Sequence, residues 1–158
     1  MDTFISNNPE ETFGLGQRWA AELRPGWIVG LIGDLGTGKT QLVQGLAAGL
    51  GIPGTVTSPT FALLQEHDDG TLPLAHIDLY RLGGQSDIVG AGLEHYLTAP
   101  DGVTAVEWFE RWLGGGWRLG QPLPEPALPS AGQVLRPVRP SDDGGTRRES
   151  QRGDVSGW

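Results

Sequence analysis

Residues 33–40, GDLGTGKT, carry three glycines, two threonines and a lysine, a set of residue types that binds phosphate. Glycines permit backbone torsions that residues with a Cβ avoid, so backbone amides can approach an anion closely. The segment matches the phosphate-loop pattern G-x-x-x-x-G-K-[ST] in full. A glycine-rich turn with an accidental GKT is the alternative. It is disfavoured because an apolar run precedes the loop and helical spacing follows it.

The pattern gives each residue of the loop a role. Lys39 is predicted to neutralise the β- and γ-phosphates, and the Thr40 hydroxyl to bind Mg²⁺. Lys39 is the single lysine among eleven basic residues, and a planar guanidinium replaces a compact ammonium poorly in a tight pocket. The remaining residues would bind the phosphates with the amides of the loop and the helix N-terminus: Gly33, Asp34, Leu35, Gly36, Thr37 and Gly38.

Carboxylates close two apolar segments further along the chain. Asp78 follows Leu72 to Ile77 and is predicted to be the metal-side carboxylate beside the phosphate loop; a cap of the following turn is the alternative. Glu107 follows residues 103–106. It could orient the attacking water or hold a metal-bound water. The alternative is a surface acid at the end of a strand. His76 shares a strand face with Asp78, and is either a catalyst or a buried, hydrogen-bonded side chain.

The segment Ser58-Pro59-Thr60 falls where a switch loop lies in folds of this type. A threonine hydroxyl there can sense the γ-phosphate through Mg²⁺. Without that context, a plain proline turn is the simpler interpretation.

The elements that must position these residues begin with a short strand at residues 3–6. Residues 8–11, NPEE, are typical of a helix start with an asparagine cap, and apolar residues at helical spacing continue to about Leu23. Residues 27–32 form a nearly continuous apolar run, as in a parallel strand buried on both faces. A helix to about Gly49 follows the phosphate loop.

The next elements are a loop or short-strand region at 52–70, the strand ending at Asp78, a helix at 86–97, a strand at 103–106 and a further turn at 110–113. This order predicts an α/β class and a P-loop NTPase fold, with a mainly parallel central sheet flanked by helices.

Composition divides the chain near Gly114, after which Gly, Pro, Ser and charged residues dominate. We expect residues 1–118 to form the P-loop domain and residues 119–158 to be a disordered C-terminal tail.

The net charge of −8 argues against broad contacts with nucleic acid, including DNA, because these need clustered Lys and Arg. The absence of cysteine excludes disulfides and thiolate metal sites. No signal-like segment and no apolar run of about 18 residues appears, so we expect a cytoplasmic protein without membrane contact.

Five segments together resemble, in order and spacing, the TsaE (YjeE) family of small bacterial P-loop ATPases: GDLGTGKT (33–40), TSPTF (57–61), HIDLYRL (76–82), GLEHYL (92–97) and VEWFER (106–111). The resemblance covers residues from about 3 to 113, and the combination of SPTF, H-x-D-L-Y-R and EW is specific. It implies ATP binding, slow hydrolysis and a need for the protein in making N6-threonylcarbamoyladenosine on tRNA. It also implies action on a complex of TsaD and TsaB, with tRNA reached indirectly through that complex.

The resemblance assigns further roles, with ATP and Mg²⁺ as cofactors. Thr60 would be the switch threonine near Mg²⁺, and Asp78 the metal-side aspartate. Glu107 would be important for ATP turnover and would be part of the metal site, and Trp108 would pack beside the nucleotide. Thr12 matches a threonine that lies near the nucleotide in the family. Past Glu-Trp, family members usually continue with further strands, and here only residues 133–139 resemble a strand fragment.

Three other functions use a phosphate loop. A translation-type GTPase needs a lysine in N-K-x-D, and the sole lysine belongs to the phosphate loop. A small-molecule kinase needs an arginine-bearing lid, for which Arg81, Arg111 and Arg118 are available. A nucleotide-dependent binding module would use ATP to order the SPTF loop as a docking face, without productive hydrolysis.

Overall fold

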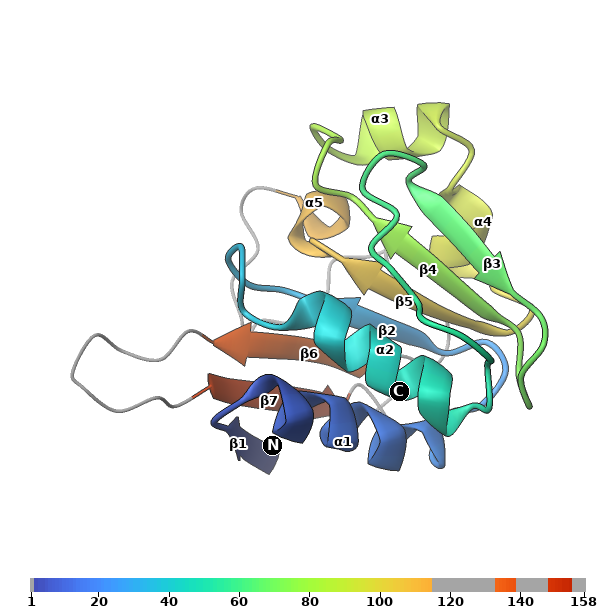
Figure 1. Ribbon diagram of the computed structural model, residues 1–158. Helices are drawn as coiled ribbons and strands as arrows, with labels where there is room; N and C mark the ends of the chain where they lie inside the picture. Colours follow the sequence, from blue (N-terminus) through green and yellow to red (C-terminus); the bar gives the residue numbers. More distant parts are fainter. Residues whose placement is uncertain (1, 115–132, 139–147, 155–158) are drawn as a thin grey trace.

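The computed structural model describes residues 2–114, 133–138 and 148–154 (Figure 1). In chain order the elements are β1 (Asp2–Ser6), α1 (Pro9–Ala20), β2 (Ile28–Leu31), α2 (Lys39–Gly49), β3 (Leu64–His67), β4 (Leu74–Asp78), α3 (Gln85–Gly90), α4 (Glu94–Thr98), β5 (Val103–Glu107), α5 (Glu110–Leu113), β6 (Gln133–Val138) and β7 (Arg148–Asp154).

Within these residues the strands form one seven-stranded sheet in the order β1-β7-β6-β2-β5-β4-β3. The inner strands β6, β2, β5 and β4 run parallel, whereas β3 at one edge and the β7–β1 pair at the other are antiparallel. The predicted α/β fold with a mainly parallel central sheet is therefore confirmed, with antiparallel strands added at both edges.

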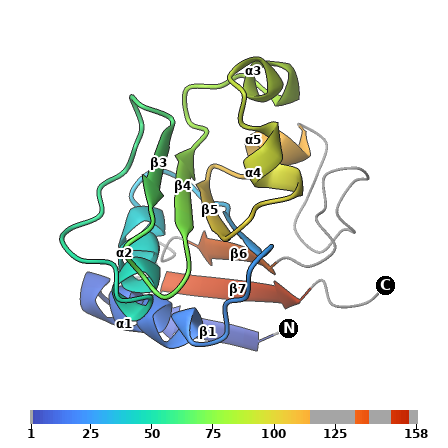
Figure 2. The ribbon, with the colours of Figure 1, turned by 90° about the vertical axis from the view of Figure 1, so that its right-hand side faces the viewer.

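Helices cover both faces of the sheet, with α1 and α2 on one side and α3, α4 and α5 on the other (Figures 1 and 2). Alternate residues of each strand face opposite layers. On β2, for example, Val29 packs in the α1/α2 layer and Ile28 in the other, and both are buried. Among the described helices, none combines the length and the apolar character that a membrane span requires.

The start of α1 follows from its local sequence. Asn8 caps the helix: its Oδ1 accepts from the Glu11 amide at 2.8 Å, and its Nδ2 donates to Glu11 Oε1 at 3.1 Å. The other carboxylate oxygen, Oε2, accepts from the Asn7 amide at 2.7 Å. This reciprocal cap confirms the predicted helix start.

Two predicted helices differ from the structure. The expected helix at 86–97 divides into α3 and α4, because Gly92 adopts a left-handed φ of +76° between them. Helix α1 ends at Ala20 rather than near Leu23, where the chain turns toward β2.

Two segments of the tail that was expected to be disordered, β6 and β7, form strands of the sheet. β6 pairs parallel with β2 and antiparallel with β7, and β7 pairs with β1. Pro137 weakens the strand pattern because proline has no amide hydrogen to donate. The pairing with β2, however, covers only Gln133 to Leu135, so Pro137 lies beyond it. The other residues predicted to form the tail lie outside the described residues, and the boundary at 118 stays a prediction.

Candidate functional site

The phosphate loop joins β2 to α2, as its sequence context predicted. Gly36 and Gly38 have φ values of +76° and +97°, a region that residues with a side chain rarely adopt. Gly38 is also the N-cap residue of α2, so the loop leads directly into the helix N-terminus. The glycine spacing therefore fixes the path of the loop and directs the first turn of α2 at the site.

Lys39 is buried within the loop, with 5% of its surface exposed. Its Nζ donates to the carbonyl oxygens of Gly33 and Asp34, both at 2.7 Å. The ammonium also lies 4.1 Å from the centroid of the Trp108 ring, within cation–π range. Burial lowers the pKa of Lys39, and the neighbouring carboxylates, with Glu107 the largest contributor, oppose that shift. The charge of the single lysine is thus held beside the loop by carbonyls, a ring and carboxylates.

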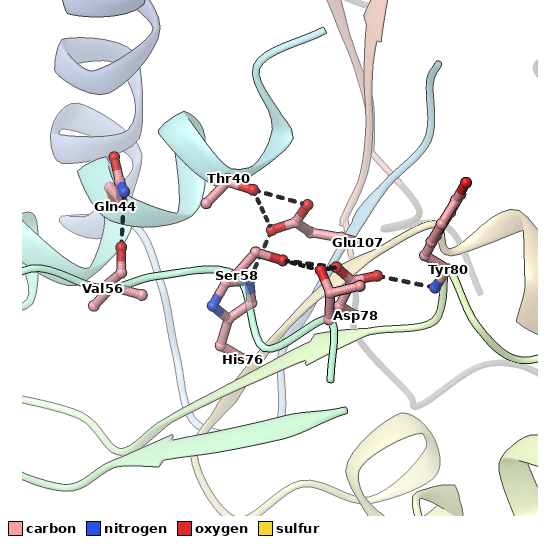
Figure 3. A network of polar contacts seen from close by, with 9 residues as sticks. Thr40, Gln44, Val56, Ser58, His76, Asp78, Tyr80 and Glu107 are labelled. Atoms are coloured by element: carbon pink, nitrogen blue, oxygen red, sulfur yellow. Dashed lines mark hydrogen bonds and ion pairs between the residues drawn. The ribbon is translucent and has the colours of Figure 1, made fainter. Parts of the chain in front are cut away.

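Glu107 is fixed by partners from two other elements (Figure 3). The Thr40 hydroxyl, at the start of α2, contacts both carboxylate oxygens, at 2.8 Å and 3.0 Å. His76 Nε2 on β4 lies 2.9 Å from Glu107 Oε1, and both side chains are buried. His76 is therefore the buried, hydrogen-bonded side chain of the two alternatives, and its partner is a candidate catalytic carboxylate.

Asp78 lies beside Glu107, since the two residues are paired in the register of β4 and β5. The hydroxyls of Ser58 and Thr60 each donate to Asp78 Oδ2 at 2.7 Å. The Tyr80 amide donates to the other oxygen at 2.9 Å. The SPT segment is thus anchored on the strand-end aspartate, which goes beyond a plain proline turn.

These side chains surround one cavity of about 460 Å³. Its lining residues are Pro9, Leu35, Gly36, Gly38, Lys39, Thr40, Gln41, Ser58, Thr60, Asp78, Tyr80, Glu107 and Trp108. Most of the predicted site residues therefore meet in one place. Pro9, Gln41 and Tyr80 were not predicted to lie at the cavity, although Tyr80 follows Asp78 by two residues and Gln41 directly follows the loop.

Four predicted residues do not line the cavity. The Gly33 and Asp34 carbonyls bind Lys39, and Thr37 donates to the Asp34 carbonyl at 2.9 Å. Thr12 is buried: its Oγ1 lies 2.7 Å from Ser6 Oγ and donates to the Asn8 carbonyl at 3.2 Å. Here Pro9 of α1, rather than Thr12, borders the cavity.

Trp108 has a strained backbone, with a φ of +59° in a region unfavourable for a bulky residue. Its ring lies 5.0 Å from that of Tyr80 and covers the Lys39 ammonium. Strain of this kind persists where the surrounding structure imposes it, often at functional sites. The strain here places an aromatic wall on the cavity.

The oxygen ligands at the cavity suit Mg²⁺, which favours hard oxygen donors. Thr40, Asp78 and Glu107 provide a hydroxyl and two carboxylates there. Among the described residues, no group of three or more His, Cys, Asp or Glu side chains is arranged to hold a metal. That arrangement is not required, because Mg²⁺ usually takes one or two carboxylates together with waters and substrate phosphates.

A buried parallel strand that leads through G-x-x-x-x-G-K-T into a helix, with carboxylates at neighbouring strand ends, defines a P-loop protein. The sequence model of the family described as "Threonylcarbamoyl adenosine biosynthesis protein TsaE" matches residues 6–124. The chain therefore belongs to the TsaE family, a family involved in the biosynthesis of threonylcarbamoyladenosine on tRNA.

Similar proteins carry the same family name, tRNA threonylcarbamoyladenosine biosynthesis protein TsaE. The Bacillus subtilis protein is 46% identical over 64% of this chain and 62% of its own length. The Synechocystis protein is 50% identical over 61% of this chain and 62% of its own. Both matches thus span less than two thirds of the relative. The crystal structure of Bacillus subtilis YdiB is similar with a TM-score of 0.71 and 34% identity, covering 98% of this chain and 86% of that one.

Proposed function

We propose that this protein is an ATP-binding, slowly hydrolysing accessory ATPase required for N6-threonylcarbamoyladenosine modification of tRNA. It acts in the cytoplasm on a complex of TsaD and TsaB and reaches tRNA indirectly through that complex. The observation that carries the proposal is the convergence of the phosphate loop, Asp78 and Glu107 on one cavity. Membership of the TsaE family supports the pathway.

The phosphates would bind at the N-terminus of α2, where the loop amides and the helix dipole favour anions. Lys39, already positioned by the Gly33 and Asp34 carbonyls, would neutralise phosphate charge from the floor of the loop. Bound Mg²⁺ would supply further charge neutralisation, and Thr40 and Asp78, which line the cavity, would hold it.

Glu107 would orient the attacking water. A water-positioning group must itself have a fixed direction, and here Thr40 and His76 hold both carboxylate oxygens. The carboxylate also borders the cavity, whereas His76 does not line it. We therefore give Glu107 the role of touching the reacting groups and His76 the role of positioning Glu107.

A second candidate, an ATP-dependent binding module without productive hydrolysis, is favoured by one observation. Ser58 and Thr60 are hydrogen-bonded to Asp78, and the next residue, Phe61, is 83% exposed. A change at Asp78 on nucleotide binding would be transmitted to this exposed side chain. Both candidates bind ATP, and only the ATPase requires Glu107.

The first experiment measures phosphate release from ATP with and without a purified TsaD–TsaB pair, using Lys39→Ala as the control. Slow release alone, faster release with the pair and loss of both in the control are expected. ADP formation that a small metabolite stimulates without matching phosphate release, and with no effect of the pair, would instead identify a small-molecule kinase, because a kinase transfers the γ-phosphate to its substrate.

The second experiment compares Glu107→Ala with Glu94→Ala, an exposed carboxylate on α4 that does not line the cavity. Glu107→Ala is expected to bind ATP and to lose partner-stimulated hydrolysis, whereas Glu94→Ala keeps both. Partner function that survives in Glu107→Ala without turnover would favour the binding module. Unchanged stimulated turnover would remove Glu107 from the mechanism.

A further inference from the structure

A second cavity, of about 190 Å³, lies at the opposite end of the parallel strands from the phosphate loop. It borders the first residues of β4 and β5, whereas Asp78 and Glu107 are the last residues of the same strands. In Figures 1 and 2, α4 covers this part of the sheet, on the face away from α1 and α2. The lining residues are Glu66, Asp68, Pro73, Leu74, Ala75, His95, Tyr96, Pro100, Asp101, Gly102, Val103 and Thr104. None of them lines the phosphate-loop cavity.

Three neighbouring strands form the floor. Glu66 on β3 is paired with Ala75 on β4, and Ala75 with Thr104 on β5. Side chains directly opposite one another on adjacent strands share a face of the sheet. The short Ala75 side chain therefore leaves a hollow between the carboxylate of Glu66 and the hydroxyl of Thr104.

Thr104 is the unusual member of this row, because its side chain is fully buried and polar. None of the described residues makes a hydrogen bond to its Oγ1. Buried polar atoms nearly always have a partner, and a hydroxyl oxygen can accept from an N–H donor. The hydroxyl is thus an unpartnered acceptor among the residues that line the cavity.

The rim of the cavity is acidic and aromatic. Glu66, Asp68 and Asp101 supply carboxylates, and the described lining residues include no lysine or arginine. The Tyr96 hydroxyl donates to Glu66 Oε1 at 2.8 Å, which orients that carboxylate. The rings of Tyr96 and His95 pack edge to face at 5.9 Å. Carboxylates combined with an aromatic ring attract organic cations.

We propose that this cavity binds the cationic end of an alkyl chain, an ammonium or a guanidinium group. Its N–H groups would donate to Thr104 Oγ1 and to Glu66. Asp68 and Asp101 are exposed at the rim, where their charges would attract the cation, and Asp101 Oδ2 lies 3.6 Å from His95 Nε2. A metal ion fits less well, because no group of three or more ligating side chains in the described structure is arranged to hold one. The inference is independent of the proposed ATPase, since the two cavities share no lining residue.

The test titrates the full chain with butylguanidinium, butylammonium and neutral butylurea at low salt, followed by amide chemical shifts. Saturable shifts at residues 66, 75, 96 and 104 are expected for the cations in the millimolar range, and none for butylurea. The peptide acetyl-Gly-Gly-Arg-Gly-Gly-amide distinguishes the source of the cation. Tighter binding of the peptide than of butylguanidinium points to a side chain of a protein partner, and weaker binding to a free small molecule.

Variants with matched controls locate the site. Thr104→Val is expected to weaken cation binding about ten- to a hundredfold, the contribution of one hydrogen bond that involves a charged group. It should leave the thermal midpoint unchanged or raised, because it removes a buried hydroxyl without a partner. Asp101→Asn should weaken binding about two- to fivefold, as for an exposed charge pair. Glu94→Gln makes the same charge change on α4 outside the cavity and should have less than about a twofold effect.

Three results would overturn the proposal: shifts from butylurea equal to those from the cations, binding unchanged in Thr104→Val, or equal losses in Asp101→Asn and Glu94→Gln. If Thr104→Val does not fold, the comparison of Asp101→Asn with Glu94→Gln still decides the outcome.

Discussion

Helices α1 and α2 approach so closely at Gly16 that a single methyl group should separate them. A Cβ at this position would lie 2.4 Å from the Leu42 carbonyl oxygen and 2.9 Å from the Gly45 Cα. Ordinary van der Waals contact begins at 3.4 Å, so the helix backbones must move apart by about 1 Å. Backbone atoms in the middle of a helix cannot swing aside as a flexible side chain can.

The expected magnitude comes from two opposing terms. Alanine favours a helix over glycine by about 1 kcal/mol, and forcing extra atoms into a packed interface costs about 1–3 kcal/mol. Because the clash is with backbone, the upper part of that range applies, and we expect Gly16→Ala to lower the free energy of unfolding by about 1–2 kcal/mol. For a chain of this size that is a fall of about 2–8 °C in the thermal midpoint.

Gly14 on the same helix supplies the matched control. Its Cβ would meet only Arg18 Nη1, at 3.7 Å, which is ordinary contact with a flexible side chain. Gly14→Ala should therefore gain the helix propensity alone, up to about 1 kcal/mol, and raise the midpoint by about 2–4 °C. Thermal and urea unfolding followed by circular dichroism would measure both variants. If Gly16→Ala stabilises the protein as Gly14→Ala does, the close packing of α1 on α2 is wrong.

Two further predictions concern the site, and a third concerns the stability contributed by Glu110 on α5. His76→Leu should reduce ATP turnover more than His76→Gln, because glutamine can still donate a hydrogen bond to Glu107. The measurement is partner-stimulated phosphate release, with ATP affinity expected to stay unchanged. Equal rates of release in the two variants would contradict the positioning role of His76. ATP should change tryptophan emission because phosphate draws the Lys39 ammonium from the Trp108 ring; a change that survives in Trp108→Phe would contradict the contact. Burial raises the pKa of Glu110, whose Oε2 has no hydrogen-bond partner among the described residues. The folded protein favours the protonated form of Glu110. The contribution of this carboxyl group to the free energy of unfolding is therefore present below the unfolded pKa and lost as pH rises through the folded pKa. Glu110→Gln should therefore raise the thermal midpoint relative to the wild type at pH 8 and not at pH 4; an equal effect at both would contradict the burial of the charge.

Local signals were enough for the elements that surround the phosphate loop. The cap at Asn8, the apolar run of β2 and the helical spacing after Lys39 each depend on residues close in sequence. The division of the expected 86–97 helix also has a local cause, the left-handed Gly92. The presence of Gly92 in the sequence does not by itself predict a break between two helices, because glycine also tolerates helical torsions.

The C-terminal strands could not be predicted in the same way. β6 and β7 lie in a part of the chain whose Gly, Pro and charge content resembles disorder, and their pairing depends on β2 and β1, more than 90 residues away. Strand formation there is a property of the partner strands as much as of the segment itself.

The sequence by itself determined the phosphate loop and the strand-end carboxylates, because the loop torsions demand glycine and the apolar runs end where the acids begin. Only the tertiary structure decided which side chains meet. Because β5 lies between β2 and β4 in the sheet, Glu107 reaches Thr40 and His76, residues 67 and 31 positions away. The same strand order places Thr104 and Glu66 on either side of Ala75. Contacts of this range depend on the order and register of strands, which no local pattern encodes.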